Sequence, residues 1–233
     1  MASSAELLTA YVSLELLSFS LYILVSMSRD EPKSNEAGLK YIIIGAFSSA
    51  LLLYGISMVY STLGVTQFDS ISTALANTGY VSPALWVGMA LILVGLGFKL
   101  AAVPFHMWAP DVYEGAPFPV TAYLAIASKA AAFALVLRLF AEAFLPAVDH
   151  WQIVVAVLAA LTMLGGNLVA LAQHNIKRLM AYSGIGQVGI ILTGIAALSA
   201  DSILPASGVM LYPVSYTHLR AHETSLHLVC RLL

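Results

Sequence analysis

Six long apolar stretches dominate this sequence of 233 residues. Each reaches the length of about 20 mostly apolar residues that a helix needs to cross the hydrocarbon core of a bilayer. Charged residues make up only 9% of the chain, whereas soluble domains carry about 25%. The sequence therefore predicts an all-α, polytopic membrane protein with about six transmembrane helices. The expected spans cover residues 5–28, 39–63, 84–104, 118–141, 150–172 and 177–199.

Composition and charge exclude several other classes of function. The formal net charge is −2 and the charges are spread singly, so there is no basic field for nucleic acid. Cys230 is the only cysteine, which excludes a disulfide framework and a CxxC metal or redox motif. The histidines and carboxylates show no metal-ligand spacing. The N-terminus lacks the basic region and cleavage site of a signal peptide, so we expect the first apolar stretch to remain as a span.

A proline-rich segment follows the third apolar stretch. Residues 103–119 read VPFHMWAPDVYEGAPFP and contain four prolines. Proline removes a backbone donor and breaks a helix. Broken backbone at membrane depth is tolerated only where protein buries it or where it lines a watery cavity. We therefore predict one discontinuous helix over residues 84–115, with the break near Val103 and Pro104.

Basic residues gather in alternate loops, which predicts an orientation under the positive-inside rule. The loop 29–40 carries three of them and the loop 173–178 carries two, whereas the loop 64–83 has only Asp69. We expect the protein to span the inner membrane of a prokaryotic cell several times, with loops 29–40 and 173–178 in the cytoplasm. The basic residues are Arg29, Lys33, Lys40, Lys177 and Arg178.

The character of the chain changes near its C-terminus. Residues 213–233 contain three histidines, two arginines and a glutamate, a composition that does not fit a membrane span. We therefore divide the chain into a transmembrane part, residues 1–212, and a tail, residues 213–233. A frameshift, a cloning scar or an assembly join is our preferred explanation for the tail, and a genuine soluble tail is the alternative.

Three ionisable residues lie in the middle of expected spans: Glu15, Lys99 and Lys129. Each such group costs about 2.5–3.5 kcal/mol on membrane-insertion scales, so each marks a candidate functional site. A buried lysine loses its proton more easily, and a carboxylate partner restores its charged form. One acid and two bases in three spans therefore indicate a proton relay. We expect the side chains of Glu15 and Lys99 to approach within ion-pair distance.

Each candidate also has a structural interpretation. The Glu15 carboxylate could bind a Ser or Thr hydroxyl on a neighbouring helix. Lys99 could extend toward the membrane interface, and Lys129 could be a paired charge at a helix-packing face. His106, in the proline-rich segment, is either structural or a further member of the relay. Both interpretations stay open for His106.

Two further features have plain structural interpretations. We expect Asp111 and Glu114 to cap or solvate a helix end on the cytoplasmic side. Residues 184–189 read GIGQVG and fit the pattern GxGxxG. No strand precedes them and they lie inside an apolar span, so they are not a dinucleotide-binding fingerprint. Glycines in the spans allow close packing of helices.

Three segments resemble a known family. Residues 95–140, GLGFKLAAVPFHMWAPDVYEGAPFPVTAYLAIASKAAAFALVLRLF, closely resemble the broken-helix region of the N subunit of NADH-quinone oxidoreductases, the respiratory complex I. Residues 13–26, SLELLSFSLYILVS, resemble the fifth helix of that family. Residues 167–194 resemble its ninth-to-tenth helix region. The wording PFHMWAPDVYEGAP is closer to the N subunit than to its M and L relatives or to sodium/proton antiporter subunits.

The resemblance implies a partial antiporter-like fold. Glu15, Lys99 and Lys129 match the glutamate of the family's fifth helix and the lysines of its seventh and eighth helices. The family has two inverted five-helix repeats, and this chain resembles the fifth to tenth helices. The second broken helix and the helices before the glutamate are missing, so we expect Met1 to be an internal position and the fragment not to pump by itself.

The resemblance also implies a function. It predicts a proton-translocating subunit that works in the lipid bilayer beside the other membrane subunits of complex I, driven by quinone reduction elsewhere in the complex. NADH, flavin, iron–sulfur clusters and quinone would belong to that complex, with no cofactor in this chain. A subunit of a multisubunit cation/proton antiporter is the alternative function. A structural membrane scaffold is the second alternative.

Overall fold

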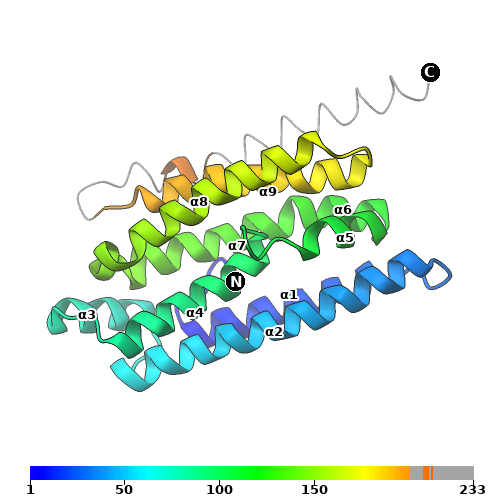
Figure 1. Ribbon diagram of the computed structural model, residues 1–233. Helices are drawn as coiled ribbons and strands as arrows, with labels where there is room; N and C mark the ends of the chain where they lie inside the picture. The colour runs from blue at the N-terminus through cyan, green and yellow to red at the C-terminus, as the bar shows by residue number, and fades with distance from the viewer. Residues whose placement is uncertain (200–206, 210, 212–233) are drawn as a thin grey trace.

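The computed structural model describes residues 1–199, 207–209 and 211. These residues form helices joined by loops, and Figure 1 shows the long helices lying side by side. The predicted all-α class is confirmed, and the expected tail, 213–233, lies outside the described residues. In chain order the elements are α1 (Leu7–Val25), α2 (Pro32–Leu63), α3 (Phe68–Thr78), α4 (Pro83–Leu100), α5 (Trp108–Gly115), α6 (Phe118–Ala125), α7 (Ala127–Arg138), the π-helical turn η1 (Leu139–Ala143), the 3₁₀ turn η2 (Leu145–Ala147), α8 (Val148–Leu171) and α9 (Ile176–Ala196).

Six helical segments of the described chain are long and apolar enough to cross a membrane. They correspond to the six predicted spans, with differences at their ends. The helix α2 begins at Pro32, inside the expected loop 29–40, because proline is favoured in a first helical turn and Glu36 pairs with Lys40 one turn later. Its 32 residues have a length of about 48 Å, more than the hydrocarbon core of about 30 Å. The charged first turns of α2 therefore lie beyond the apolar part of the span.

The predicted discontinuous helix over 84–115 is present. The helix α4 ends at Leu100, Ala101 adopts a left-handed conformation with φ 61°, and α5 begins at Trp108. The indole of Trp108 donates a hydrogen bond from Nε1 to the backbone oxygen of Phe98 at 2.8 Å. A carbonyl freed at the end of α4 is thus bound inside the protein, as broken backbone at membrane depth requires.

One helix of the structure is not predicted by the pattern of long apolar stretches. The segment 64–83, expected to be a loop, contains the amphipathic helix α3. Its apolar residues Phe68, Ile71 and Leu75 are buried, and α3 packs on the turns η1 and η2. Asp69 lies in its first turn, where a negative charge is favoured. The 11 residues of α3 are too few for a membrane span, so counting long apolar stretches could not find this helix.

Glycines bring several helices close together, as the sequence analysis expects. A Cβ atom on Gly166 in α8 would lie 2.5 Å from the backbone nitrogen of Gly186 in α9. A Cβ atom on Gly55 in α2 would lie 2.8 Å from the backbone oxygen of Gly88 in α4. Larger side chains at these positions would push the helices apart. Small residues therefore set the spacing of the α8–α9 and α2–α4 pairs.

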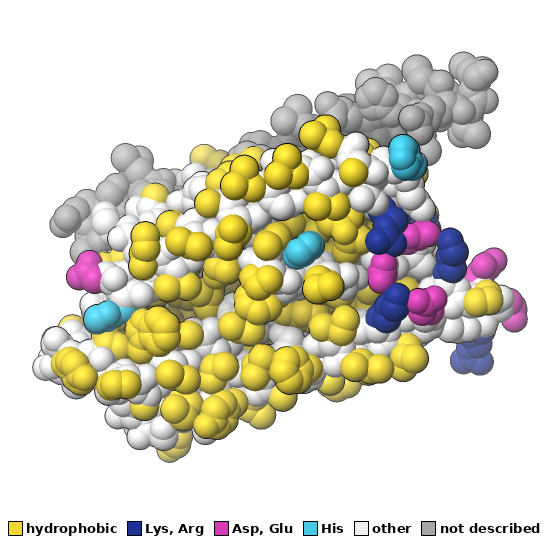
Figure 2. Space-filling model, viewed as in Figure 1, with side chains coloured by type: hydrophobic (Ala, Val, Ile, Leu, Met, Phe, Trp, Pro, Cys, Tyr) yellow, Lys and Arg dark blue, Asp and Glu magenta, His cyan; other side chains and the backbone are white. Residues whose placement is uncertain are grey.

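The side of the bundle is apolar. Figure 2 shows hydrophobic side chains spread over the lateral face, while most of the visible Lys, Arg, Asp and Glu side chains gather at one end. Such a continuous apolar surface is typical of a chain that faces lipid rather than water. Exposed large side chains on α1 and α8 include Leu16, Phe19, Ile23, Leu161, Leu164 and Leu168.

Candidate proton-transfer site

Glu15 lies in the middle of α1 and faces α2. Its Oε1 accepts a hydrogen bond from the Oγ of Ser49 at 2.5 Å. The glutamate is half-buried, and the serine lies in the apolar part of the α2 span. This contact is the one that the structural interpretation of Glu15 expected, a hydroxyl on a neighbouring helix. It leaves the carboxylate beside a donor that is itself uncharged.

Lys99 lies in the last turn of α4, just before the break, and only 3% of it is exposed. Its Nζ donates a hydrogen bond to the Oγ of Ser18 at 2.9 Å. Ser18 is also buried and donates to the backbone oxygen of Leu14 at 2.8 Å. The ammonium group therefore stays inside the protein and does not extend to the membrane interface.

The expected direct ion pair between Glu15 and Lys99 is wrong. No ion pair of the described residues joins the two side chains. Ser18 and Ser49 bind them separately, and both serines line one small cavity of about 10 Å³ together with Lys99. The reason is geometric: Glu15 lies on the side of α1 that faces Ser49, whereas Ser18, about one turn further on, faces Lys99.

Lys129 lies in α7 and is 7% exposed. The chain is interrupted at Ile126, between α6 and α7, about one turn before this lysine. Its Nζ lies 5.8 Å from the ring centroid of Tyr113, a distance at which an ammonium group is attracted to an aromatic face. Across from it, Gly184 of α9 makes room, because a Cβ atom there would lie 3.3 Å from the lysine Nζ.

His106 lies in the break between α4 and α5 and is half-buried. Its ring meets the ring of Tyr182 edge to face, with centroids 6.3 Å apart. Its Nδ1 is buried and forms no hydrogen bond with the part of the chain that the structure describes.

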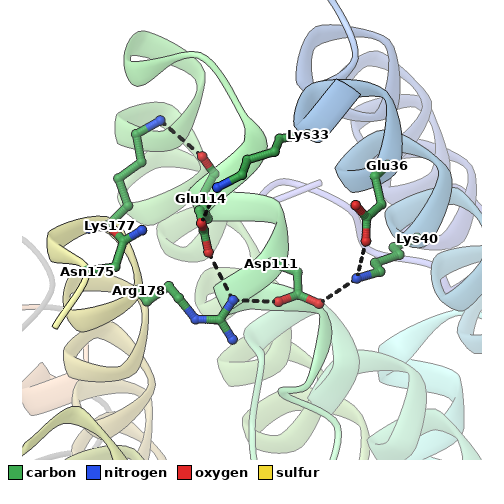
Figure 3. A network of polar contacts seen from close by, with 8 residues as sticks. All are labelled: Lys33, Glu36, Lys40, Asp111, Glu114, Asn175, Lys177 and Arg178. Carbon is green, nitrogen blue, oxygen red and sulfur yellow. Dashed lines mark hydrogen bonds and ion pairs between the residues drawn. The ribbon is translucent and has the colours of Figure 1, made fainter. Parts of the chain in front are cut away.

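Asp111 and Glu114 belong to a network of ion pairs that joins three helices. They were expected to cap or solvate a helix end, but they bind cations from two other helices (Figure 3). The Nη1 of Arg178 in α9 contacts both carboxylates, at 2.9 Å to Asp111 and 3.0 Å to Glu114. We call this network the ionic cluster. Its members are Lys33, Glu36, Lys40, Asp111, Glu114, Lys177 and Arg178.

The ionic cluster ties the first turns of α2 to α5. Lys33 binds Glu114 at 2.9 Å, and Lys40 binds Asp111 at 2.9 Å. Lys177 of α9 donates to the backbone oxygen of Glu114 at 3.2 Å, so a cation also satisfies a carbonyl at the end of α5. The loops 29–40 and 173–178 therefore lie on the same side of the bundle, as the distribution of basic residues predicted.

The carboxyl groups of Asp111 and Glu114 are held in the charged form. Burial raises the pKa of Asp111, but hydrogen bonds and charge from Lys40 and Arg178 outweigh it and lower that pKa below its usual value. Hydrogen bonds from Lys33 and Arg178 lower the pKa of Glu114. These groups therefore act as fixed anchors for α5 at neutral pH rather than as proton carriers.

The described residues contain no group of three or more His, Cys, Asp or Glu side chains that could hold a metal ion. The segment 184–189 with the pattern GxGxxG lies inside α9. It follows a helix rather than a strand, so its glycines serve helix packing.

Comparison with known proteins decides the family. The sequence profile of the family described as "NADH:quinone oxidoreductase/Mrp antiporter, TM" matches residues 4–223. The chain belongs to this family. The match extends beyond residue 212, where we expected the transmembrane part to end.

Relatives within the NADH:quinone oxidoreductase/Mrp antiporter family include two bacterial proteins named NADH-quinone oxidoreductase subunit N. The one from Desulforamulus reducens is 50% identical over 216 residues, which cover 93% of this chain and 44% of that protein. The one from Rhodospirillum rubrum is 46% identical over 231 residues, covering 99% of this chain and 47% of that protein. The chain thus spans about half the length of the curated relatives that it matches.

Solved structures of the family share the fold. A chain of respiratory complex I from Thermus thermophilus, solved with bound aureothin, superposes with a TM-score of 0.76 at 36% identity, covering 93% of this chain and 45% of that one. A chain of the Mrp complex from Dietzia sp. superposes with a TM-score of 0.80 at 24% identity, covering 91% and 39%. The second likeness shows the fold alone. The antiporter-like fold that the sequence predicts is therefore confirmed.

Proposed function

We propose that this chain is part of a proton-translocating membrane subunit of NADH-quinone oxidoreductase. The burial of Lys99 and Lys129, which are 3% and 7% exposed inside apolar spans, carries the proposal. An ionisable group at such a place is costly and is retained where ions or protons pass. The names of the relatives, which are NADH-quinone oxidoreductase N subunits, support the choice of complex.

In this proposal Glu15, Lys99 and Lys129 are successive proton stations. A change in the charge of Glu15 alters how strongly Lys99 holds its proton, because an opposite charge nearby favours the ammonium form. When that support is withdrawn, the proton passes from Lys99 toward Lys129. The break between α4 and α5 lies beside this route, and the buried Nδ1 of His106 is placed in the break.

The energy for this cycle comes from redox chemistry in other subunits. We place NADH, flavin, iron–sulfur clusters and quinone there, and the other membrane subunits of the complex beside this chain in the lipid bilayer. We further place the protein in the inner membrane of a prokaryotic cell. The ionic cluster, which gathers Lys33, Lys40 and Arg178 at one end, supports a cytoplasmic position for loops 29–40 and 173–178.

A subunit of a cation/proton antiporter is the second candidate. The family description names both complexes, and the Mrp chain has the same fold. The higher identity to the N subunits favours the first candidate. Neighbouring genes for M and L subunits would support complex I, and a cation-antiporter operon would support the second candidate. A structural scaffold, by contrast, would work equally well without the buried lysines.

The test uses the full-length subunit within its complex, reconstituted in proteoliposomes. We expect Lys99→Ala and Lys129→Ala each to depress NADH-driven proton uptake, while the complex still assembles and reduces artificial electron acceptors. Arg29→Ala is the matched control, since this arginine is exposed, forms no ion pair with the described residues and lies outside the relay. If both buried-lysine variants take up protons at the wild-type ratio and rate, the proposed function is overturned.

A further inference from the structure

Two serines stand between the acid and the base of the proposed relay. Ser18 of α1 is 2% exposed and accepts the hydrogen bond of the Lys99 ammonium group at 2.9 Å. Ser49 of α2 donates to Glu15 at 2.5 Å. Neither charged group is bound by the other. Each is bound by a neutral hydroxyl, which can both donate and accept a hydrogen bond.

The two hydroxyls share one cavity. Its volume is about 10 Å³, and its lining includes Ser18, Ser48, Ser49 and Lys99. A polar cavity of about 10–15 Å³ can hold a single water that binds two to four polar groups. Ser48 donates to the backbone oxygen of Gly95 in α4 at 3.3 Å, which holds α2 against α4 beside the cavity. The cavity beside Lys99 is therefore small, partly polar and fixed by three helices, and Glu15 reaches it through the hydroxyl of Ser49.

We propose that Ser18 and Ser49 are the positioning residues of this site: their hydroxyls hold Lys99 and Glu15 beside one polar cavity, through which the two groups exchange a proton. The proposal rests on the proposed function. One proton leaves the Glu15 carboxylic acid, which becomes a carboxylate, and one proton reaches the neutral amine of Lys99, which becomes an ammonium group. The hydroxyls and a water in the cavity each accept one proton and release another, so they are unchanged after the transfer.

The arrangement has a physical advantage over a direct ion pair. A carboxylate in contact with an ammonium group stabilises the charged form strongly, and the proton is then hard to remove. A serine hydroxyl stabilises the same ammonium less. Lys99 can therefore release its proton toward Lys129 when the charge of Glu15 changes, and it can then regain a proton from Glu15 through the cavity.

The test compares hydroxyl removal with hydroxyl retention in the full-length subunit within its complex. Ser18→Ala removes a hydrogen bond to a charged group, and we expect the rate of NADH-driven proton uptake to fall about tenfold. The alkaline limb of the pH profile should also move to lower pH by about one unit, because the ammonium form loses its acceptor. Ser18→Thr keeps a hydroxyl and should restore both the rate and the pH profile. Ser49→Ala should likewise lower the rate of proton uptake, and Ser49→Thr, which keeps a hydroxyl, should restore it.

Ser20→Ala is the matched control. Ser20 lies on the same helix, is exposed, and donates to its own helix at the backbone oxygen of Leu16. Assembly of each variant into the complex is checked on native gels. If Ser18→Ala with Ser49→Ala pumps with the wild-type rate and pH profile while Lys99→Ala does not pump, the serine proposal alone is overturned. If Lys99→Ala pumps normally, the proposed function fails and the serine proposal fails with it.

Discussion

Lys99 and Ser18 are joined by a hydrogen bond of 2.9 Å, about one turn along α1 from Glu15. This bond connects the last turn of α4 to the middle of α1, next to the break in the third span. Glu15 is bound on its own side by Ser49. The acid and the base are thus neighbours that do not touch, and a change of charge on one is felt by the other through space rather than through a fixed ion pair.

The ionic cluster predicts a pH dependence of stability. The pKa values of Asp111 and Glu114 are lowered in the folded protein by Lys33, Lys40 and Arg178. A carboxyl group with a lowered pKa stabilises the fold above its ordinary pKa of about 4, and this contribution is lost as the pH falls through the lowered value. We expect Asp111→Asn with Glu114→Gln to unfold at a lower temperature than the wild type at pH 7.

The difference should narrow as the pH is lowered below about 4, because the wild-type carboxyl groups then become neutral as well. Each partly exposed ion pair stabilises the fold by about 0.2–1 kcal/mol. The difference in unfolding temperature at pH 7 is therefore small for one pair and adds up over the ionic cluster. The measurement is thermal unfolding in detergent over a series of pH values. Glu31→Gln is the control, because Glu31 is exposed and forms no ion pair with the described residues. A difference in unfolding temperature that stays constant down to acid pH would count against a stabilising role of the ion pairs.

The close contact of α8 and α9 predicts that a larger side chain at Gly166 lowers the stability of the fold. Gly166→Ala would place a Cβ atom 2.5 Å from the backbone nitrogen of Gly186, and backbone cannot turn aside. Overpacking of this kind costs roughly 1–3 kcal/mol. Gly165→Ala is the matched control, since its Cβ atom would meet only the side chain of Val103, at 3.2 Å. Circular dichroism during heating in detergent should show a lower unfolding temperature for the first variant, and equal temperatures would contradict the packing.

Much of the fold follows from the sequence because lipid imposes simple requirements. The length of each apolar stretch predicted the six spans, and Pro104 predicted the break. The cost of burying a charge pointed to Glu15, Lys99 and Lys129 as the residues to examine, and the structure finds both lysines buried. These requirements act along one helix at a time, which is why a sequence alone reveals them.

The contacts between helices could not be predicted in the same way. Whether Lys99 meets Glu15 or Ser18 depends on the rotation of α1 about its axis, because residues three apart lie on the same helix face and the sequence does not say which of them points at the lysine. The binding of Arg178 to Asp111 joins positions far apart in the chain. The positive-inside rule placed the basic residues on one side of the membrane, but it did not predict which carboxylates they bind.

The central claim is that Lys99 releases its proton during each cycle, and Lys99→Arg tests it most directly. Arginine keeps the positive charge and the donors that bind Ser18, but its guanidinium stays protonated. The measurement is the number of protons taken up per NADH oxidised, in proteoliposomes that contain the full-length variant within its complex, with Lys33→Arg as the control. We predict normal assembly with a clearly lower proton-to-NADH ratio or a stalled turnover. A wild-type ratio at the wild-type rate would contradict the claim.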